Sequence, residues 1–151
     1  MAYDPLEIAA FLQEKALAEG GEINLMKLQK LIYYAHGWHL AIHHAPLITM
    51  PVKAWEYGPV VPEVYHRFKH YGERPISEPL GAPCLDRETQ ALLDVIWARY
   101  GAFTGVQLAN MTHAPDSPWR NALEASPYHC GMDIPDEAMR DYFVHLASKP
   151  S

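Results

Sequence analysis

The sequence predicts a mainly α-helical protein with a compact single domain of about seven helices and one small β-hairpin. Helix-capping residues followed by apolar residues at helical spacing recur along most of the chain. Only the stretch 46–55 shows a β-like alternation. The length of 151 residues, 49% of them hydrophobic and 20% charged, suits one core rather than two. We therefore expect residues 1–151 to form one domain that needs no disulfide to fold.

The first helix is expected to begin after Asp4, which is an N-cap residue followed by Pro5 at the first helical position. Glu7 is placed to complete a capping box with Asp4. Gly20 and Gly21 end this helix, because glycine adopts the left-handed conformation of a helix C-terminus without strain.

The second helix, predicted over 25–42 with Asn24 as its cap, is apolar around most of its circumference, as is typical of a central helix. At 100° per residue, one face carries Leu28, Ile32, Ala35, His39 and Ile42. A narrow strip is expected to face solvent and comprises Lys27, Lys30, Gly37 and Ala41. A glycine inside a helix costs roughly 1 kcal/mol relative to alanine, so Gly37 predicts the close approach of a neighbouring element.

Short β-like runs at 46–49 and 52–55 predict a hairpin that turns at Met50 and Pro51, and Gly58-Pro59 predicts a second turn. Val52 and Ala54 are expected on one face of the strand and Lys53 and Trp55 on the other. The remaining elements are helices over 62–71, from the cap Asp86 to Tyr100, from the capping box at Thr104 to Thr112, from Ser117-Pro118 to about Ser126, and from Pro135 onward.

Composition excludes several classes of function. The formal net charge of −6, from 12 Lys and Arg against 18 Asp and Glu, disfavours nucleic-acid binding. The first 17 residues lack a basic segment and carry acidic residues, so they are not a signal peptide. No apolar run is long enough to span a membrane. We expect a cytoplasmic protein with no membrane partner and no nucleic-acid partner.

Nine histidines raise the question of a metal site, since His36, His39 and His43 lie on one side of the second helix. His39 falls in the apolar face, and that helix offers no acidic ligand, so we expect packing or surface histidines and no metal or other cofactor. The sequence contains no hydrolase elbow, phosphate-binding loop or zinc-protease motif. It therefore predicts a protein without catalytic residues.

Aromatic residues gather between Trp55 and Tyr65, with Tyr57 beside a turn. Trp and Tyr are enriched at protein interfaces because they combine a large rigid area with a polar group. Two interpretations stay open here: the aromatic side chains bind a partner, or Trp55 and Tyr65 attach the hairpin to the third helix.

Three blocks in order resemble the Panacea domain family, which includes SocA-like antitoxins and phage-associated GepA-like proteins. Residues 27–37, KLQKLIYYAHG, are similar to the family signature KLQKLLYYA-x-G. The second block, from Pro46-Leu47 through AWEYGPV to PEVY at 62–65, resembles PLF…AWxYGPVxPxVY. The third, from Tyr100-Gly101 to Pro118-Trp119, is similar to YG…LTG…LS…TH…PW.

The resemblance implies an antitoxin that neutralises a cognate toxin by direct protein contact, without catalysis. An alternative is a proteolytic adaptor that delivers the toxin to a cytoplasmic protease, and a second alternative is a metal-dependent enzyme that uses the histidine cluster. Aromatic density and the two lysines of the helix strip predict the partner-binding residues, which are Lys27, Lys30, Trp55, Tyr57 and Pro59.

Overall fold

In the computed structural model, which describes residues 2–125 and 131–149, helices dominate and three short strands form one antiparallel sheet. The described helices are α1 (Pro5–Ala18), α2 (Leu25–His43), α3 (Pro62–Phe68), the 3-10 turn η1 (Lys69–Tyr71), α4 (Arg87–Tyr100), α5 (Gly105–Thr112), α6 (Pro118–Ala125) and α7 (Asp136–Ser148). The strands are β1 (Lys53–Trp55), β2 (Gly58–Val60) and β3 (Met132–Asp133), in the order β2-β1-β3. The prediction of a mainly α-helical protein with minor β structure is confirmed.

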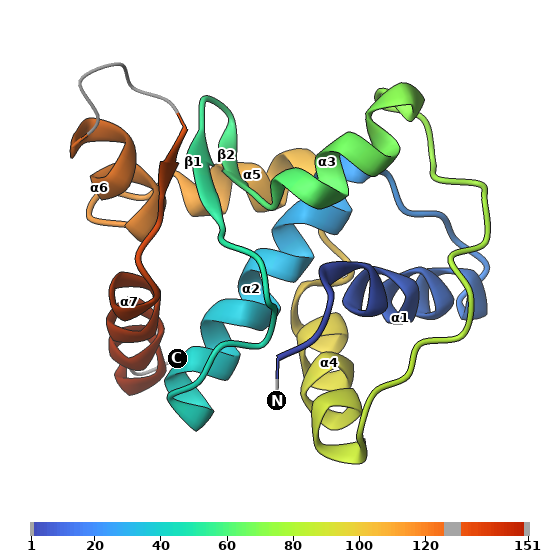
Figure 1. Cartoon of the computed structure of the whole chain (residues 1–151), viewed down its shortest axis with the longest axis horizontal. Coiled ribbons are helices and arrows are strands. Elements are labelled where there is room, and N and C mark those ends of the chain that lie inside the picture. Colours follow the sequence, from blue (N-terminus) through green and yellow to red (C-terminus); the bar gives the residue numbers. More distant parts are fainter. Residues whose placement is uncertain (1, 126–130, 150–151) are drawn as a thin grey trace.

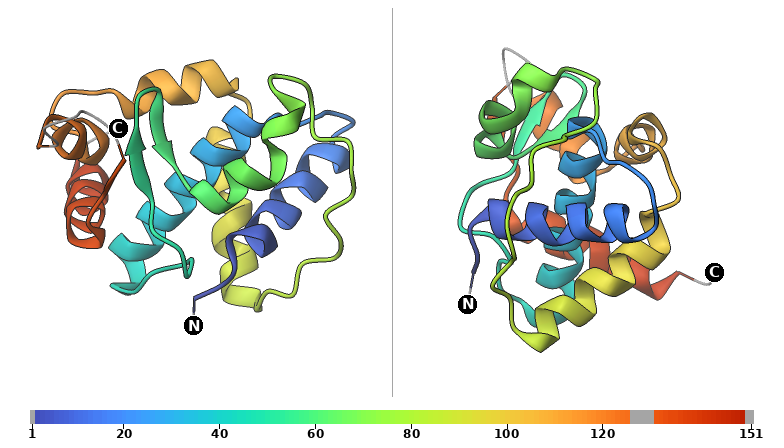
Figure 2. Two further views of the ribbon diagram at one scale, coloured as in Figure 1. Left: turned by 45° about the horizontal axis from the view of Figure 1, so that its top comes forward. Right: turned by 90° about the vertical axis from the view of Figure 1, so that its right-hand side faces the viewer.

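Helix α2 runs through the centre of the molecule, as its apolar circumference predicts (Figure 1). It packs against α1, α3, α4, α5, α7 and β2, and every residue from Leu28 to Trp38 is buried. Helices α1 and α4 lie on one side of α2 and α7 on the other, while α3, α5 and the β1–β2 hairpin surround its first half (Figures 1 and 2). None of the helices in the described part of the chain is long and apolar enough to cross a membrane.

The helix starts are set by local capping. The Asn24 carboxamide accepts from the Lys27 N–H at 2.9 Å, and the Asp86 carboxylate accepts from the Thr89 N–H at 2.7 Å. Thr104 begins α5 with the predicted capping box, whose two bonds to Gln107 are both present.

Of the capping box predicted for α1, the Asp4 cap is present but the return bond from Glu7 is not. Asp4 caps the helix by accepting from the Leu6 N–H at 2.9 Å. The Glu7 carboxylate does not turn back to Asp4; it accepts from the Cys84 N–H at 2.7 Å. A distant backbone donor has replaced the local one, so Glu7 attaches the chain before α4 to α1.

The hairpin exists, but its predicted register is wrong. Its strands pair Lys53 with Val60 and Trp55 with Gly58, so the turn lies at Glu56-Tyr57 and not at Met50-Pro51. Residues 46–49 are not a hairpin strand; Leu47 and Ile48 are buried, and Ile48 forms an isolated bridge with the chain start. The alternation along 52–55 is confirmed, with Val52 and Ala54 buried. Strand β3, which the sequence pattern did not reveal, covers the other edge of β1.

Two expectations for α2 need correction. Ile42 lies near the end of the helix and is 56% exposed, although its phase matches the buried face. The strip assigned to solvent is buried in its middle, since Lys30 is 3% exposed and Gly37 is also buried. The close approach expected at Gly37 is confirmed: a Cβ added there would overlap three ring atoms of Phe143 from α7.

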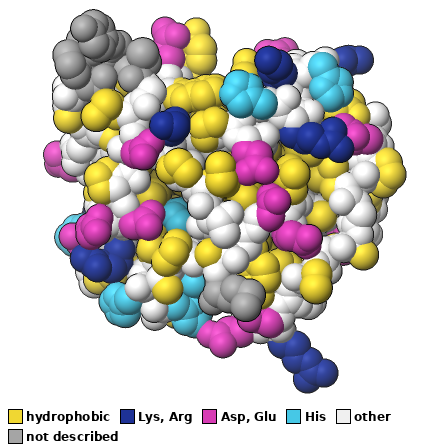
Figure 3. All heavy atoms as spheres, viewed as in Figure 1, with side chains coloured by type: hydrophobic (Ala, Val, Ile, Leu, Met, Phe, Trp, Pro, Cys, Tyr) yellow, Lys and Arg dark blue, Asp and Glu magenta, His cyan; other side chains and the backbone are white. Residues whose placement is uncertain are grey.

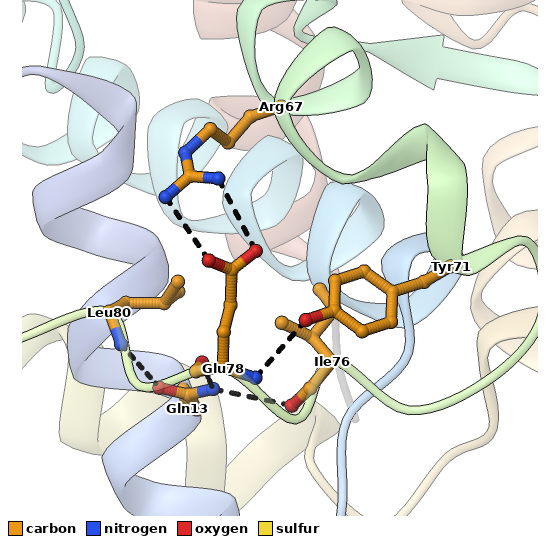
Figure 4. Close-up of polar contacts among 6 residues, drawn as sticks. All are labelled: Gln13, Arg67, Tyr71, Ile76, Glu78 and Leu80. Carbon is orange, nitrogen blue, oxygen red and sulfur yellow. Dashed lines mark hydrogen bonds and ion pairs between the residues drawn. The ribbon is translucent and has the colours of Figure 1, made fainter.

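A long connection between η1 and α4 is held against α1 by one amide side chain (Figure 4). The Gln13 amide group donates to the carbonyl oxygens of Ile76 (3.3 Å) and Glu78 (2.8 Å) and accepts from the Leu80 N–H (3.1 Å). The Glu78 carboxylate also forms two bonds with the Arg67 guanidinium of α3. These contacts satisfy backbone groups that no strand pairs, which explains how the segment keeps a defined path.

Candidate functional site

A cleft of about 500 Å³ lies between the start of α2, the β1–β2 hairpin, the α3–η1 segment and the start of α5. Its lining is largely apolar and aromatic, and it draws on all three sequence blocks. The buried lining residues, which we call the floor, are Leu25, Gln29, Lys30, Val60 and Gly105. The exposed apolar ones, which we call the rim, are Met26, Tyr57 and Val106.

Polar side chains of α2 bind the backbone of the second block and so define the floor. The Gln29 amide group donates to the Val61 carbonyl at 3.1 Å and accepts from the Val61 N–H at 2.9 Å. The Lys30 ammonium donates to the carbonyl oxygen of Pro59 at 3.1 Å. Because Gln29 and Lys30 are both 3% exposed, these bonds satisfy groups that burial would otherwise leave unpaired.

The third block holds the hairpin from the opposite side. The Trp119 indole N–H donates to the Trp55 carbonyl at 2.6 Å. The His113 ring contacts the Tyr57 carbonyl at 3.1 Å through Nε2, which must carry the proton because a carbonyl oxygen only accepts. The His113 and Trp119 rings stack with centroids 4.3 Å apart. The backbone of the exposed turn is therefore held by hydrogen bonds from the buried Trp119 and the half-buried His113.

Gly58 sits at the point where the hairpin meets α2. Its φ of 136° belongs to a region that side chains rarely adopt, and a Cβ added there would lie 2.8 Å from Cε of Lys30. A side chain at position 58 would therefore be strained by this φ and would also require the end of the Lys30 side chain to shift.

Lys30 is the buried cation of the floor. Burial lowers its pKa to about 8 from the ordinary value of 10.5. Among the ion pairs between described residues none includes Lys30, and Glu73, which also lines the cleft, contributes nothing to the shift. The floor thus holds an amine whose charged form is disfavoured by its surroundings.

This lowered pKa predicts a pH dependence of stability that Lys30→Met removes. Between about pH 8 and 10.5 the unfolded chain keeps a proton at Lys30 that the folded chain releases, so stability rises with pH. From pH 8 to 9.5 the free energy of unfolding of the wild type should increase by about 1.5 kcal/mol more than that of the variant. Urea denaturation of both proteins at pH 7, 8, 9 and 9.5 measures the difference. A difference that stays constant would contradict a lowered pKa at Lys30.

The rim exposes apolar surface around the cleft. Tyr57 is 71% exposed, Val106 61% and Met26 37%. The Trp55 and Tyr65 rings, which also line the cleft, pack edge to face with centroids 5.0 Å apart. This contact confirms that Trp55 and Tyr65 attach the hairpin to α3, and both rings still leave part of their surface in the cleft.

Charged side chains gather beside this apolar surface. On the face shown in Figure 3, histidine, lysine and arginine side chains lie at the upper right, over α3 and η1. The exposed basic side chains of α3 and η1 include His66, Lys69 and His70. At the end of η1, the charged residue that lines the cleft itself is the exposed Glu73.

The structure separates the five predicted partner-binding residues. Trp55, Tyr57 and Lys30 line the cleft, whereas Lys27 and Pro59 do not. The expected exposure of Lys30 is wrong, since this residue is buried, and Pro59 is buried as well. Lys27 is half-buried, because its ammonium donates to the Gly101 carbonyl at 2.6 Å. Burial also lowers the pKa of Lys27, with Glu19 opposing the shift.

Sequence reasoning missed several lining residues. Met26 and Val106 come from different helices and meet only because Gly105 packs closely on α2, where an added Cβ would lie 2.8 Å from the Lys27 nitrogen. Gly72 and Glu73 enter the wall from the end of η1. Of these four residues, Val106 lies within the three blocks, so the blocks carried no signal for Met26, Gly72 and Glu73.

The histidines of α2 have separate partners. His36 is buried, accepts from the Leu47 N–H at 3.3 Å and contacts the Asp136 carboxylate at 3.2 Å, which lowers the Asp136 pKa. His39 contacts the Ala45 carbonyl, and His43 pairs with Glu88 at 3.1 Å. Within residues 2–125 and 131–149 no three His, Cys, Asp or Glu side chains are grouped to hold a metal ion.

Comparison with known proteins agrees with the arrangement of the blocks. Residues 28–120, more than half of the chain, match the family described as "Antitoxin SocA-like, Panacea domain". The chain is 28% identical to "Antitoxin SocA" of Caulobacter vibrioides (strain NA1000 / CB15N) over 155 residues, which cover 93% of this chain and 82% of that protein. No solved structure matches. The match across all three blocks places this chain in the SocA-like antitoxin family with a Panacea domain.

Proposed function

We propose that this protein is a non-enzymatic antitoxin that acts in the cytoplasm and neutralises a cognate toxin by direct binding, with the cleft and its rim as the docking surface. The observation that carries the proposal is the exposed apolar rim around an apolar cleft. Apolar patches with polar surroundings are typical of protein interaction sites. Membership of an antitoxin family makes a toxin the partner to test first.

The composition of the surface supports a protein partner. Tyr57 offers a large rigid ring at the tip of a turn that β2, α5 and α6 hold in place. Such pre-organised aromatic residues contribute strongly to interfaces, because little conformational entropy is lost when they are covered. Val106 and Met26 extend the apolar area along α5 and α2.

Co-expression tests the proposal. The probe is the product of the reading frame that neighbours the gene of this protein, expressed alone and together with it. We expect growth arrest from the neighbour alone, rescue by this protein, and a complex of the two purified proteins. Absence of both rescue and complex formation would refute the proposal.

Direct neutralisation and proteolytic delivery differ in the fate of the toxin. Direct binding predicts that rescue leaves the toxin at an unchanged cellular half-life and that the purified complex is inactive without a protease. Rescue accompanied by rapid toxin loss, and abolished when the cell lacks its cytoplasmic protease, would instead assign the adaptor function.

The double variant Tyr57→Ser/Val106→Ser is expected to weaken toxin binding at least tenfold without lowering the melting temperature. Both side chains are mostly exposed, so their loss costs the fold little, whereas truncating central interface residues costs about 2 kcal/mol or more. Calorimetric titration with the toxin and thermal melts measure the two effects.

The matched control is Val95→Ser on α4, where the valine is 60% exposed and lies outside the cleft. It makes the same substitution as Val106→Ser, at a valine that is equally exposed. Equal affinities for the double variant, the control and the wild type would place the toxin on another face.

A further inference from the structure

We infer that the cleft receives an acidic side chain of the toxin beside an apolar one, and that the Lys30 ammonium pairs with that carboxylate. This inference rests on the proposed function, since it names the chemistry by which the same cleft recognises its partner. It concerns a residue buried in the free protein that would act as a specificity determinant in the complex.

The first observation is that the buried Lys30 ammonium of the floor has no carboxylate partner among the described residues. Lys30 is 97% removed from solvent, yet the only bond that its ammonium makes within the described residues is to a carbonyl oxygen, that of Pro59. An ammonium carries three donors. Two half-buried lysines, by contrast, reach carboxylates: Lys15 binds Asp94 at 2.5 Å, and Lys53 binds Asp133 at 2.7 Å. Buried charges are normally paired, so Lys30 departs from the common pattern.

The second observation is the position of Lys30. It lines a cleft of about 500 Å³, a volume in the range of sites that enclose small ligands or side chains. The neighbouring lining is supplied by Trp55, Tyr65 and Val60, which favour an apolar group. Because Lys30 is already shielded from solvent, a charge pair formed with a partner group in the cleft would be screened little by salt.

The third observation concerns the alternatives within the chain. Glu73 is the acidic residue of the lining, but it is exposed and makes no ion pair with Lys30. The other nearby acid of the hairpin, Glu56, is exposed at the turn and does not line the cleft. Charge complementarity therefore assigns the carboxylate to the partner and not to this protein.

Lys30→Met tests the inference, because methionine preserves the unbranched apolar stem and removes the charge. The variant is expected to fold with a melting temperature within a few degrees of the wild type, since the loss of the bond to Pro59 is offset by the removal of a buried charge. Its affinity for the toxin should fall at least tenfold. Truncating one partner of a buried charge pair typically has effects of this size or larger.

Lys15→Met is the matched control, because it makes the same change in net charge on α1, away from the cleft. The probe is the neighbouring-gene toxin. Its Asp and Glu residues are replaced one at a time by Asn and Gln, and binding to the wild type and to Lys30→Met is measured. We expect that replacing one acidic residue of the toxin weakens its binding to the wild type as much as Lys30→Met does. The same toxin variant should bind Lys30→Met no more weakly than the unmodified toxin does.

The outcomes separate the inference from the proposed function. Toxin binding that is equally tight to the wild type and to Lys30→Met would overturn the inference and leave direct neutralisation intact. Additive losses for every toxin variant would also overturn it. If the toxin fails to bind or to be neutralised by the wild type, the proposed function fails and the inference falls with it.

Discussion

Leu28→Ala is expected to lower the free energy of unfolding by about 2–5 kcal/mol. Leu28 is fully buried in the first turn of α2, the central helix that packs against α1, α3, α4, α5, α7 and β2. Removing its branched end costs the transfer free energy of the lost atoms and leaves a cavity that a central helix cannot collapse to fill. For a domain of this size the melting temperature should fall by roughly 5–20 °C.

Leu17→Ala is the control for this substitution, because the same atoms are removed from a leucine that is 59% exposed on α1. Its melting temperature should stay close to that of the wild type. Thermal melts and urea titrations of both variants measure the contrast. A melt of Leu28→Ala equal to that of the wild type would contradict the burial of this face of α2.

Antitoxin activity should fall in Leu28→Ala cells for a reason unrelated to the docking surface. Loss of a few kcal/mol from a total of roughly 5–15 kcal/mol reduces the amount of folded protein in the cell. The purified variant, measured below its melting temperature, should bind the toxin with nearly unchanged affinity. This combination distinguishes a core residue from Tyr57, whose replacement weakens binding without affecting stability.

Gly37→Ala is expected to destabilise the protein, although alanine is the better helix former by about 1 kcal/mol. An added Cβ would overlap the Phe143 ring, which is fully buried and packs edge to face against Tyr33 and Trp38. Overpacking of this kind typically costs about 1–3 kcal/mol. The cost here should lie at the upper end or beyond it, because the ring is confined on several sides.

A double-mutant cycle with Phe143→Leu tests the cause of this effect. Leucine lacks the outer ring atoms that an alanine at position 37 would meet, so Gly37→Ala should cost at least about 1 kcal/mol less in the Phe143→Leu background. Urea denaturation of the four proteins gives the coupling. Strict additivity would show that the contact between α2 and α7 does not explain the glycine.

The features that the sequence predicted correctly depend on interactions between residues close together in the chain. Caps such as Asn24, Asp86 and Thr104 bond to backbone groups three residues away, so their effect is contained in a few neighbouring residues. The central role of α2 followed from its apolar circumference. The same reasoning predicted the element behind Gly37 without naming α7.

The errors have a common physical cause, which is a partner far away in the chain. The turn was placed at Met50-Pro51 because β-like runs flank it, but β1 pairs instead with β2, where α2 side chains bind the backbone of Pro59 and of the following Val61. Similarly, Glu7 has the spacing of a capping box and binds Cys84 instead. A local signal is overridden when tertiary contacts satisfy the same groups better.

By itself the sequence determined a mainly helical domain, the starts of most helices, the central position of α2 and the resemblance to an antitoxin family, because periodicity, capping and motif order are properties of the chain. Only the tertiary structure decided that Lys30 is buried, that Lys27 and Pro59 lie outside the cleft, and that Met26, Tyr57 and Val106 share one rim. A polar side chain on a helix looks solvent-facing until a carbonyl oxygen from another segment, here that of Pro59, is shown to accept its hydrogen bond. The site depends on three blocks that meet in space, and their meeting is a property of packing.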